Sequence, residues 1–158
     1  MSITVRPAQR KDYPAVARIL RQIAQLHADL RPDIFRPASQ KYGKKQFAAL
    51  LKNKETPILI AQNEQGEMLG YAMLRVMTIR KNPVFCPRQF LHVDDLCVDE
   101  TSRGLGIGTA LMGGVRELAE ERGIRKIQLN VWGCNQGALK FYERQGFQTQ
   151  RRQLELDL

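Results

Sequence analysis

The stretch VDETSRGLGIGTALM, residues 98–112, joins an apolar, strand-like segment to a helical pattern. Three glycines, Gly104, Gly106 and Gly108, alternate in its middle, and Arg103 precedes them. The first N–H groups of a helix have no partner within the helix and carry partial positive charge, so such a turn can bind an anion. Glycines also let the backbone approach that anion closely. The stretch predicts a phosphate or pyrophosphate site, with a plain tight turn as the alternative.

Two common phosphate-binding turns do not fit this stretch. A P-loop has Lys and then Ser or Thr after its second glycine, whereas Gly108 is followed by Thr109 and Ala110. The Rossmann fingerprint has the spacing G-x-G-x-x-G in an opening βαβ unit, whereas these glycines alternate and come late in the chain. Neither of these two folds is therefore expected.

Length and composition are typical of one soluble globular domain over residues 1–158: hydrophobic content is 43% and charged content 26%. The start of the chain lacks the apolar core of a signal peptide, and no apolar run is long enough to cross a membrane. We therefore expect a cytoplasmic protein. Its cysteines, Cys86, Cys97 and Cys134, form no CxxC pair, which predicts free thiols and no metal site.

The chain is strongly basic, with a formal net charge of +9 and a sequence pI near 9.8. Such a surface favours anionic partners such as nucleic acids or phosphorylated cofactors. The basic residues are scattered, however, and no recognition helix or aromatic-basic RNA motif stands out. A solvated basic surface is the main interpretation, and a nucleic-acid partner is not expected.

Hydrophobic periodicity predicts the element order β-α-α-β-β-β-α-β-α-β. Asp12 and Asn135 are expected to cap helices at their N-termini, and Gly123 to end one. Local hairpins supply antiparallel strand pairs and a helical crossover supplies a parallel one, so the fold class is α/β with a mixed sheet. The expected strands cover 3–6, 57–62, 68–79, 89–98, 126–132 and 147–158, and the expected helices cover 12–30, 40–52, 106–122 and 135–146.

Three segments together resemble the GNAT N-acetyltransferases. Residues 103–108, RGLGIG, match the family's R/Q-x-x-G-x-G/A signature. The segments LHVDDLCVDE (91–100) and KIQLNVW (126–132) resemble the family's central strand and the next parallel strand. NQGALKFYERQGF (135–147) resembles its N-x-x-A-x-x-F-Y-x-x-x-G-F element. The resemblance covers nearly the whole chain and implies a three-layer domain, with a mostly antiparallel mixed sheet flanked by helices.

The resemblance also implies a co-substrate, acetyl-CoA or a close acyl-CoA, and no metal. The family binds the pyrophosphate on the amides of the signature loop, and the pantetheine lies along the central strand, where two parallel strands splay. Asn135 would contact the pantetheine arm. The positions that match the family's binding residues are Leu96, Cys97, Val98, Arg103, Gly104, Leu105, Gly106, Ile107, Gly108, Thr109, Asn135, Ala138 and Tyr142.

Acyl transfer to an amine needs a deprotonated amine, a donor for the developing oxyanion and a proton for the leaving thiolate. By the resemblance, Tyr142 is the expected general acid and the Val98 backbone amide the oxyanion donor. A core aromatic with a satisfied hydroxyl is the alternative for Tyr142. A covalent acyl-cysteine route through Cys97 or Cys134 is disfavoured, because no His or acidic partner stands at a fixed spacing.

The general base is less sharply defined. Strict strand alternation places His92 and Asp94 on one face of the central strand and Asp95 on the other. Charged residues in a central strand need a partner or a cavity. His92 matches the position where some relatives have a catalytic glutamate, and Asp94 is the second candidate. The alternatives are an ordered-water relay, a structural His92 and an Asp95 that anchors a loop.

In the family, the first two helices and their connection cover the acceptor site. Here His27, Asp33 and Phe35 are the candidates, since a carboxylate beside an aromatic ring suits a cation. A turn at Asp33 and a core role for Phe35 are the alternatives. We expect an N-acetyltransferase acting on a primary amine, with a small molecule slightly favoured over a protein lysine or N-terminus. An acyl-CoA sensor without turnover is the other hypothesis, and a homodimer is expected from the family's exposed strand edges.

Overall fold

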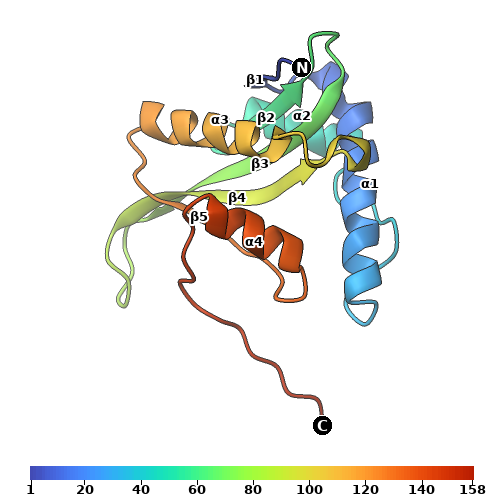
Figure 1. Ribbon diagram of the computed structural model, residues 1–158. Coiled ribbons are helices and arrows are strands. Elements are labelled where there is room, and N and C mark those ends of the chain that lie inside the picture. The colour runs from blue at the N-terminus through green and yellow to red at the C-terminus, as the bar shows by residue number, and fades with distance from the viewer.

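A five-stranded sheet, in the strand order β1-β2-β3-β4-β5, runs through the computed structural model, which describes residues 1–158 (Figure 1). The pairs β1–β2, β2–β3 and β3–β4 are antiparallel, and β4–β5 is parallel. The predicted mixed and mostly antiparallel sheet is confirmed. The strands are β1 (Thr4–Pro7), β2 (Ile58–Gln62), β3 (Met68–Ile79), β4 (Arg88–Val98) and β5 (Ile127–Leu129).

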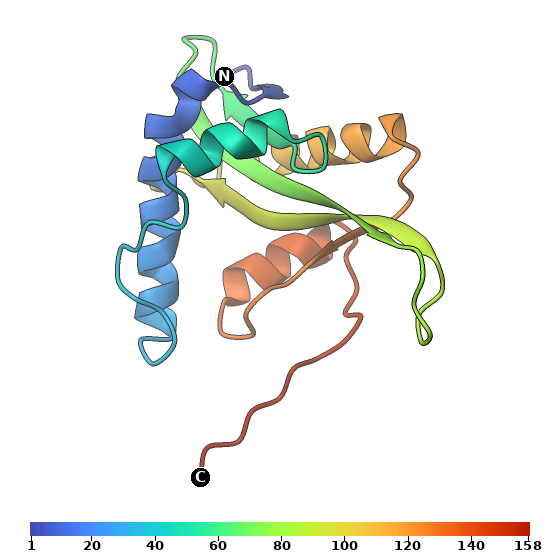
Figure 2. The ribbon, with the colours of Figure 1, turned by 180° about the vertical axis from the view of Figure 1, so that it is seen from behind.

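Helices cover both faces of the sheet and bury an apolar layer on each. On one face lie α1 (Tyr13–Leu30) and α2 (Lys44–Lys52), which stand in front of the strands in Figure 2. On the other lie α3 (Ile107–Glu121) and α4 (Gln136–Arg144). The 3₁₀ turns η1 (Arg10–Asp12) and η2 (Glu100–Ser102) lead into α1 and toward α3. The three layers predicted from the resemblance are therefore present.

The two apolar layers follow from the alternation along β3. Leu74 and Val76 pack in the layer under α3, whereas Tyr71 and Met73 pack in the layer under α1 and α2. Because successive strand residues point to opposite faces, one strand supplies both layers. Each fully buried large side chain of this kind stabilises the fold by about 1.5–3 kcal/mol.

A β-bulge interrupts β4 at the centre of the sheet. Asp95 is opposite Met73, but the next β3 residue, Leu74, is opposite Val93, so Asp94 has no partner residue. A bulge adds one residue and shifts the alternation beyond it. Asp95 consequently lies on the same face as His92 and Asp94, toward α1. The prediction that Asp95 lies on the opposite face is wrong, because strict alternation cannot anticipate an inserted residue.

The ends of several elements also differ from the prediction. The helix expected from residue 40 begins only at Lys44, after Gly43, whose extended conformation places it outside the helix. Asp12 does precede α1, but its carboxylate binds Arg6 and the Gln9 amide rather than an amide of α1. The caps at Asn135 and Gly123 are confirmed: Asn135 accepts from the Ala138 amide and Gly123 has φ +67°.

Residues 147–158 form no strand, in contrast to the prediction. They leave the body after α4 as an extended segment (Figure 1), whose side chains are exposed from residue 148 onward. A strand requires a neighbour for its backbone hydrogen bonds, and none lies beside this segment. None of the helices is long and apolar enough to span a membrane.

Candidate active site

The outer edge of β4 opens where β4 and β5 part. Their pairing ends at Val93 opposite Leu129, while β4 continues to Val98. The Asp99 N–H bonds to the Leu69 carbonyl and so faces β3. Because neighbouring residues of a strand present their backbone groups to opposite edges, those of Val98 and Leu96 face the open edge. An extended ligand can hydrogen-bond to the backbone there, as the resemblance implied for the pantetheine.

The glycine turn lies at the end of this open edge and leads into α3. Gly104 and Gly106 have φ values of +78° and +79°, which side chains with a Cβ rarely adopt. The first hydrogen bond of α3 runs from the Ala110 N–H to the Gly106 carbonyl. The amides of residues 107–109 therefore precede the helical ladder and are available to an anion. The turn has the backbone form that the anion-site prediction requires.

Gly108 has a second, structural reason to lack a side chain. A Cβ at this position would lie 3.0 Å from the Cζ atom of Phe141 on α4. The Gln145 amide also donates to the Thr109 hydroxyl, which joins the same two helices. The glycine motif (103–108) and the C-terminal motif (135–147) are thus in direct contact and pack as one unit.

Tyr142 lies on α4, with its ring against Phe141 and Phe147 at centroid distances of 5.1 and 5.5 Å. Burial raises the pKa of its hydroxyl well above the ordinary value, and the charges of Cys97 and Asp95 raise it further. The hydroxyl therefore stays protonated at neutral pH. It makes no hydrogen bond within the chain, so it is available as a donor to a ligand.

Asp95 is a largely buried acid on the α1 side of β4, and it binds an amine of the chain itself. The Nζ atom of Lys41, from the connection between α1 and α2, lies 2.9 Å from Asp95 Oδ2. The Asp95 side chain is only 16% exposed. Burial raises its pKa, and this effect outweighs the opposing attraction of Lys41. A carboxylate that already holds an ammonium group is a natural position for an amine acceptor.

His92 and Asp94 come together as predicted, but they lie on the stretch of β4 where pairing with β5 ends. His92 Nε2 lies 3.6 Å from Asp94 Oδ1, and an Arg75 guanidinium nitrogen lies 3.0 Å from Asp94 Oδ2. Residue 92 is still paired with Gln128 of β5. Both acids lie beyond the last paired residue, Val93, but Asp94 binds Arg75, whereas Asp95 binds Lys41.

Of the predicted acceptor residues, His27 and Phe35 meet and Asp33 does not join them. The rings of His27 and Phe35 are 4.9 Å apart, and Trp132 packs edge-on against Phe35 at 5.0 Å. Burial lowers the pKa of His27, and the charge of Asp95 opposes that shift. Asp33 instead binds Arg31, and this guanidinium lowers the pKa of its exposed carboxyl.

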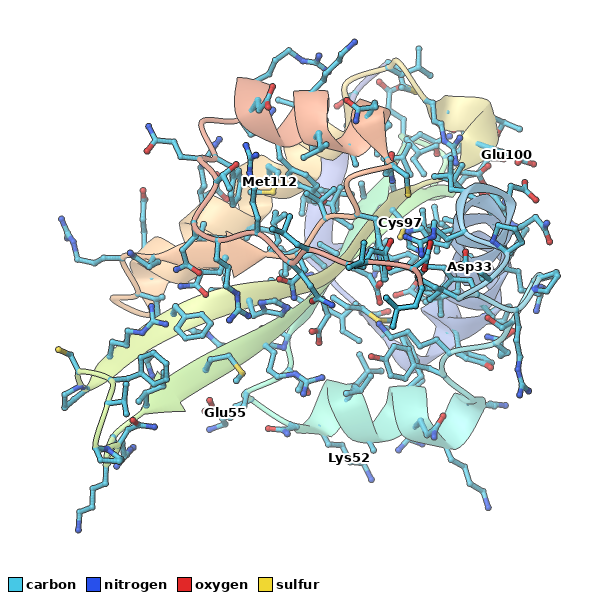
Figure 3. All side chains as sticks on the ribbon, turned by 90° about the horizontal axis from the view of Figure 1, so that it is seen from below. Asp33, Lys52, Glu55, Cys97, Glu100 and Met112 are labelled. Carbon is cyan, nitrogen blue, oxygen red and sulfur yellow. The ribbon has the colours of Figure 1, made fainter.

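Cys97 is buried beneath α1, as Figure 3 shows near the centre of the molecule, with Asp33 farther out beside α1. Burial raises the pKa of its thiol to about 12. A thiol that stays protonated is a poor nucleophile, which agrees with the disfavoured acyl-cysteine route. Cys86 and Cys134 are exposed and free. No group of three His, Cys, Asp or Glu side chains is arranged to hold a metal ion.

Sequence reasoning missed the positions of Asp95, Lys41 and Trp132. The bulge turns Asp95 toward α1, and the pair Asp94-Asp95 inside a strand was its one available signal. Lys41 and Trp132 fall within an expected helix and an expected strand, but both lie in irregular connections, because α2 begins only at Lys44 and β5 ends at Leu129, where its pairing with β4 stops.

Comparisons with known proteins agree with this geometry. The acetyltransferase (GNAT) family model matches residues 20–147. An uncharacterised N-acetyltransferase of Methanocaldococcus jannaschii is 31% identical over 112 residues, 69% of this chain and 46% of the relative. The glucosamine 6-phosphate N-acetyltransferase of Trypanosoma brucei brucei is 37% identical over 95 residues, 59% of each chain. The chain thus spans about half the length of these two curated relatives.

Likeness to solved structures extends over the whole chain. A mutant form of a Bacillus halodurans protein superposes with a TM-score of 0.93 at 29% sequence identity. The match covers 98% of this chain and 99% of the other.

Proposed function

The chain belongs to the GNAT acetyltransferase family, and we propose that it transfers an acetyl group directly from acetyl-CoA to a primary amine. The observation that carries this proposal is the open edge of β4 at residues 94–98. The glycine turn lies at the end of that edge, and the Tyr142 hydroxyl is close enough to Cys97 and Asp95 for their charges to raise its pKa. A phosphate-bearing thioester thus has a backbone edge, an anion site and a proton donor in one place.

The donor is held mainly by backbone groups in this proposal. Amides at the start of α3, with Arg103 at the turn, receive the pyrophosphate. The backbone of Leu96 and Val98 pairs with the pantetheine. Asn135 uses its Oδ1 atom to accept from the Ala138 amide, which leaves its Nδ2 group to donate to a pantetheine carbonyl. The residues present fit an acyl-CoA on these grounds.

The reaction follows from the same placement. The neutral amine attacks the thioester carbonyl, a C–N bond forms, and the Val98 amide stabilises the oxyanion. The C–S bond then breaks. Tyr142 donates its proton to the leaving thiolate, and the proton released by the amine restores the phenol through water. Because burial raises the pKa of Tyr142, the hydroxyl is protonated when the reaction begins.

The acceptor amine is assigned to the Asp95 carboxylate, where Lys41 now lies. The acceptor ammonium replaces Lys41, and Asp95 orients it before it gives one proton to solvent water and becomes the neutral amine. Phe35 and Trp132 form an aromatic wall nearby, together with His27. A small amine is slightly favoured over a protein lysine. Because the trypanosomal relative is named for glucosamine 6-phosphate, amino sugar phosphates are candidate acceptors.

An acyl-CoA sensor without turnover is the second candidate. The observation that favours it is the ion pair between Lys41 and Asp95, because an amine of the chain itself occupies the carboxylate. A sensor needs the donor site but no acceptor site.

The test is thiol release from acetyl-CoA with a panel of small amines, amino sugar phosphates, aminoglycosides and peptides, beside calorimetric binding of acetyl-CoA. A reaction without acceptor is the control, since Cys86 and Cys134 are exposed thiols. Release with one acceptor class establishes the transferase. Binding of acetyl-CoA without release supports the sensor. Absence of binding overturns both proposals.

A further inference from the structure

The glycine turn has no backbone hydrogen bonds of its own to hold it in place. None of the backbone hydrogen bonds of the chain involves Arg103, Gly104 or Leu105. The positive φ values of Gly104 and Gly106 also occur where glycine gives the backbone its widest freedom. The position of the turn therefore depends on the segments on either side of it: α3, which follows, and residues 99–102, which precede it.

Asp99, the residue after β4, organises the segment that precedes the turn. Its Oδ1 atom accepts from the N–H and the hydroxyl of Thr101, at 3.2 and 3.1 Å. Its backbone carbonyl accepts from the Ser102 N–H at 2.9 Å. Asp99 and Ser102 are only 4% and 8% exposed. The segment is thus a compact turn built around one buried carboxylate.

Two side chains of α1 bind this segment across nearly half the length of the sequence. The guanidinium of Arg18 forms an ion pair with Asp99 Oδ2. The Oε1 atom of Gln22 accepts from the Glu100 N–H at 3.1 Å, and Figure 3 shows Glu100 beside α1. Arg18 and Gln22 are four residues apart, so they lie one above the other on the same face of the helix.

The charge of Asp99 makes the contact with α1 a demanding one. Burial raises the pKa of Asp99, but the Arg18 guanidinium and the two donors of Thr101 outweigh burial, so the pKa lies below its ordinary value. The carboxylate is therefore charged at neutral pH, and Arg18 is the cation that pairs with it. A buried charge that loses its partner is strongly destabilising. The segment before the glycine turn is consequently held against α1.

We propose that Arg18 and Gln22 are positioning residues for the donor: they hold residues 99–102 and thereby fix the glycine-turn amides that receive the pyrophosphate. Neither side chain contacts the donor itself. The inference rests on the proposed function, which assigns the turn to acetyl-CoA. In this arrangement α1 serves both substrates, because His27 of the acceptor face lies on the same helix.

The experiment compares two ligands that differ in the pyrophosphate. S-Acetylpantetheine has the thioester and the pantetheine arm of acetyl-CoA but lacks the nucleotide with its pyrophosphate. Calorimetry gives the Kd of acetyl-CoA, and amide NMR titration gives that of S-acetylpantetheine. Arg18→Met should raise the first Kd roughly five- to tenfold and leave the second unchanged. Arg18→Lys should restore most of the binding. The matched control is Arg21→Met on the same helix, whose guanidinium donates to the exposed Gln40 and which should change neither Kd.

Two further variants separate positioning from damage and from direct contact. Gln22→Met removes the acceptor of the Glu100 N–H without leaving a buried charge unpaired, and it should raise the Kd of acetyl-CoA roughly two- to threefold. In an Asp99→Asn background the ion pair is already broken, so adding Arg18→Met should change that Kd by less than about twofold. A full additional loss would show that Arg18 binds the donor itself, and it would overturn the positioning role.

The remaining outcomes separate this inference from the proposed function. An equal rise of both Kd values in Arg18→Met would indicate general damage and overturn the inference, and so would an unchanged Kd of acetyl-CoA in Arg18→Met and Gln22→Met. A wild type that binds acetyl-CoA but transfers nothing contradicts the transferase alone, since the Kd values still decide the inference. A wild type that does not bind acetyl-CoA overturns the proposed donor site and this inference with it.

Discussion

In the proposed reaction, the edge and the face of β4 serve the two substrates in different ways. The open edge at residues 94–98 and the glycine turn offer backbone groups. The turn is predicted by a short sequence motif, residues 103–108. The face toward α1 offers the side chains of Asp95, Lys41 and His27, which come from a bulged strand, a connection and a helix. A donor site made of backbone can be recognised from spacing alone, whereas an acceptor site made of distant side chains cannot.

The largest effect is expected from Tyr142, where the edge and the face meet. Tyr142→Phe removes the proton donor and keeps the ring packed against Phe141 and Phe147, so kcat should fall by roughly 10²-fold or more. Steady-state kinetics with an identified acceptor, beside calorimetric binding of acetyl-CoA, measure this. The control is Thr56→Val, which also removes a part-buried hydroxyl, one that donates to the Leu50 carbonyl of α2. An unchanged kcat in Tyr142→Phe removes the residue as general acid.

The second largest effect is expected at the glycine turn, on the binding of acetyl-CoA alone. Gly106→Val forces a β-branched residue to φ +79°, at a cost of about 1–2 kcal/mol, and distorts the amides that face the pyrophosphate. The Kd for acetyl-CoA should rise roughly tenfold. Gly66→Val is the matched control, because Gly66 has φ +80° in the β2–β3 turn. Both variants should lose similar stability in urea, but only the first should lose binding. Equal binding losses would contradict an anion site at the turn.

The acceptor face is tested at Asp95. Asp95→Asn removes the charge that binds the acceptor ammonium, so the acceptor KM should rise by roughly five- to tenfold, or about 1 kcal/mol. The KM for acetyl-CoA should not change. Asp29→Asn, on the exposed Gln25–Asp29 pair of α1, is the control. A larger change in the donor KM than in the acceptor KM would reverse the assignment.

The same residue predicts a pH dependence. Because burial raises the pKa of Asp95, its carboxylate takes up a proton at a higher pH than a surface aspartate does. Acceptor binding needs the charged form, so it is present above that pKa and is lost as the pH falls through it. The acceptor KM of the wild type should therefore rise on the acid side, and that of Asp95→Asn should rise less. Parallel profiles would speak against Asp95.

The smallest effect is expected from Lys41, whose ammonium group competes with the acceptor amine for the Asp95 carboxylate. Lys41→Met removes the ammonium group that binds the Asp95 carboxylate, and this should lower the KM of a simple monoamine by roughly two- to fivefold. The control is Lys45→Met, because the side chain of Lys45 on α2 is exposed. A raised KM would show that Lys41 instead holds an anionic group of the acceptor.

The sequence predicted the strand, turn and helices around the proposed donor site well, because these parts are local. Alternation and periodicity placed β4 and α3, and the cap at Asn135 and the stop at Gly123 follow from simple backbone rules. The bulge at Asp94 escaped prediction, since it depends on register with β3. The contact of Phe35 with Trp132 likewise joins residues far apart in the chain.

The C-terminal segment, residues 147–158, shows the same limit at the level of the whole sheet. Its alternating leucines predict a strand, but none forms, because no neighbouring segment pairs with residues 147–158. A strand depends on two paired segments, and the periodicity of one segment does not show whether the other is present.

The most direct test of the division between edge and face is a pair of amide NMR titrations on one isotope-labelled sample. Acetyl-CoA should shift the amides of residues 96–98 and 103–109, and a subsequently added acceptor, or its unreactive analogue, should shift those of Asp95, His27 and Phe35. Acetyl-CoA shifts confined to the α1 face, with the glycine turn unmoved, would contradict the account.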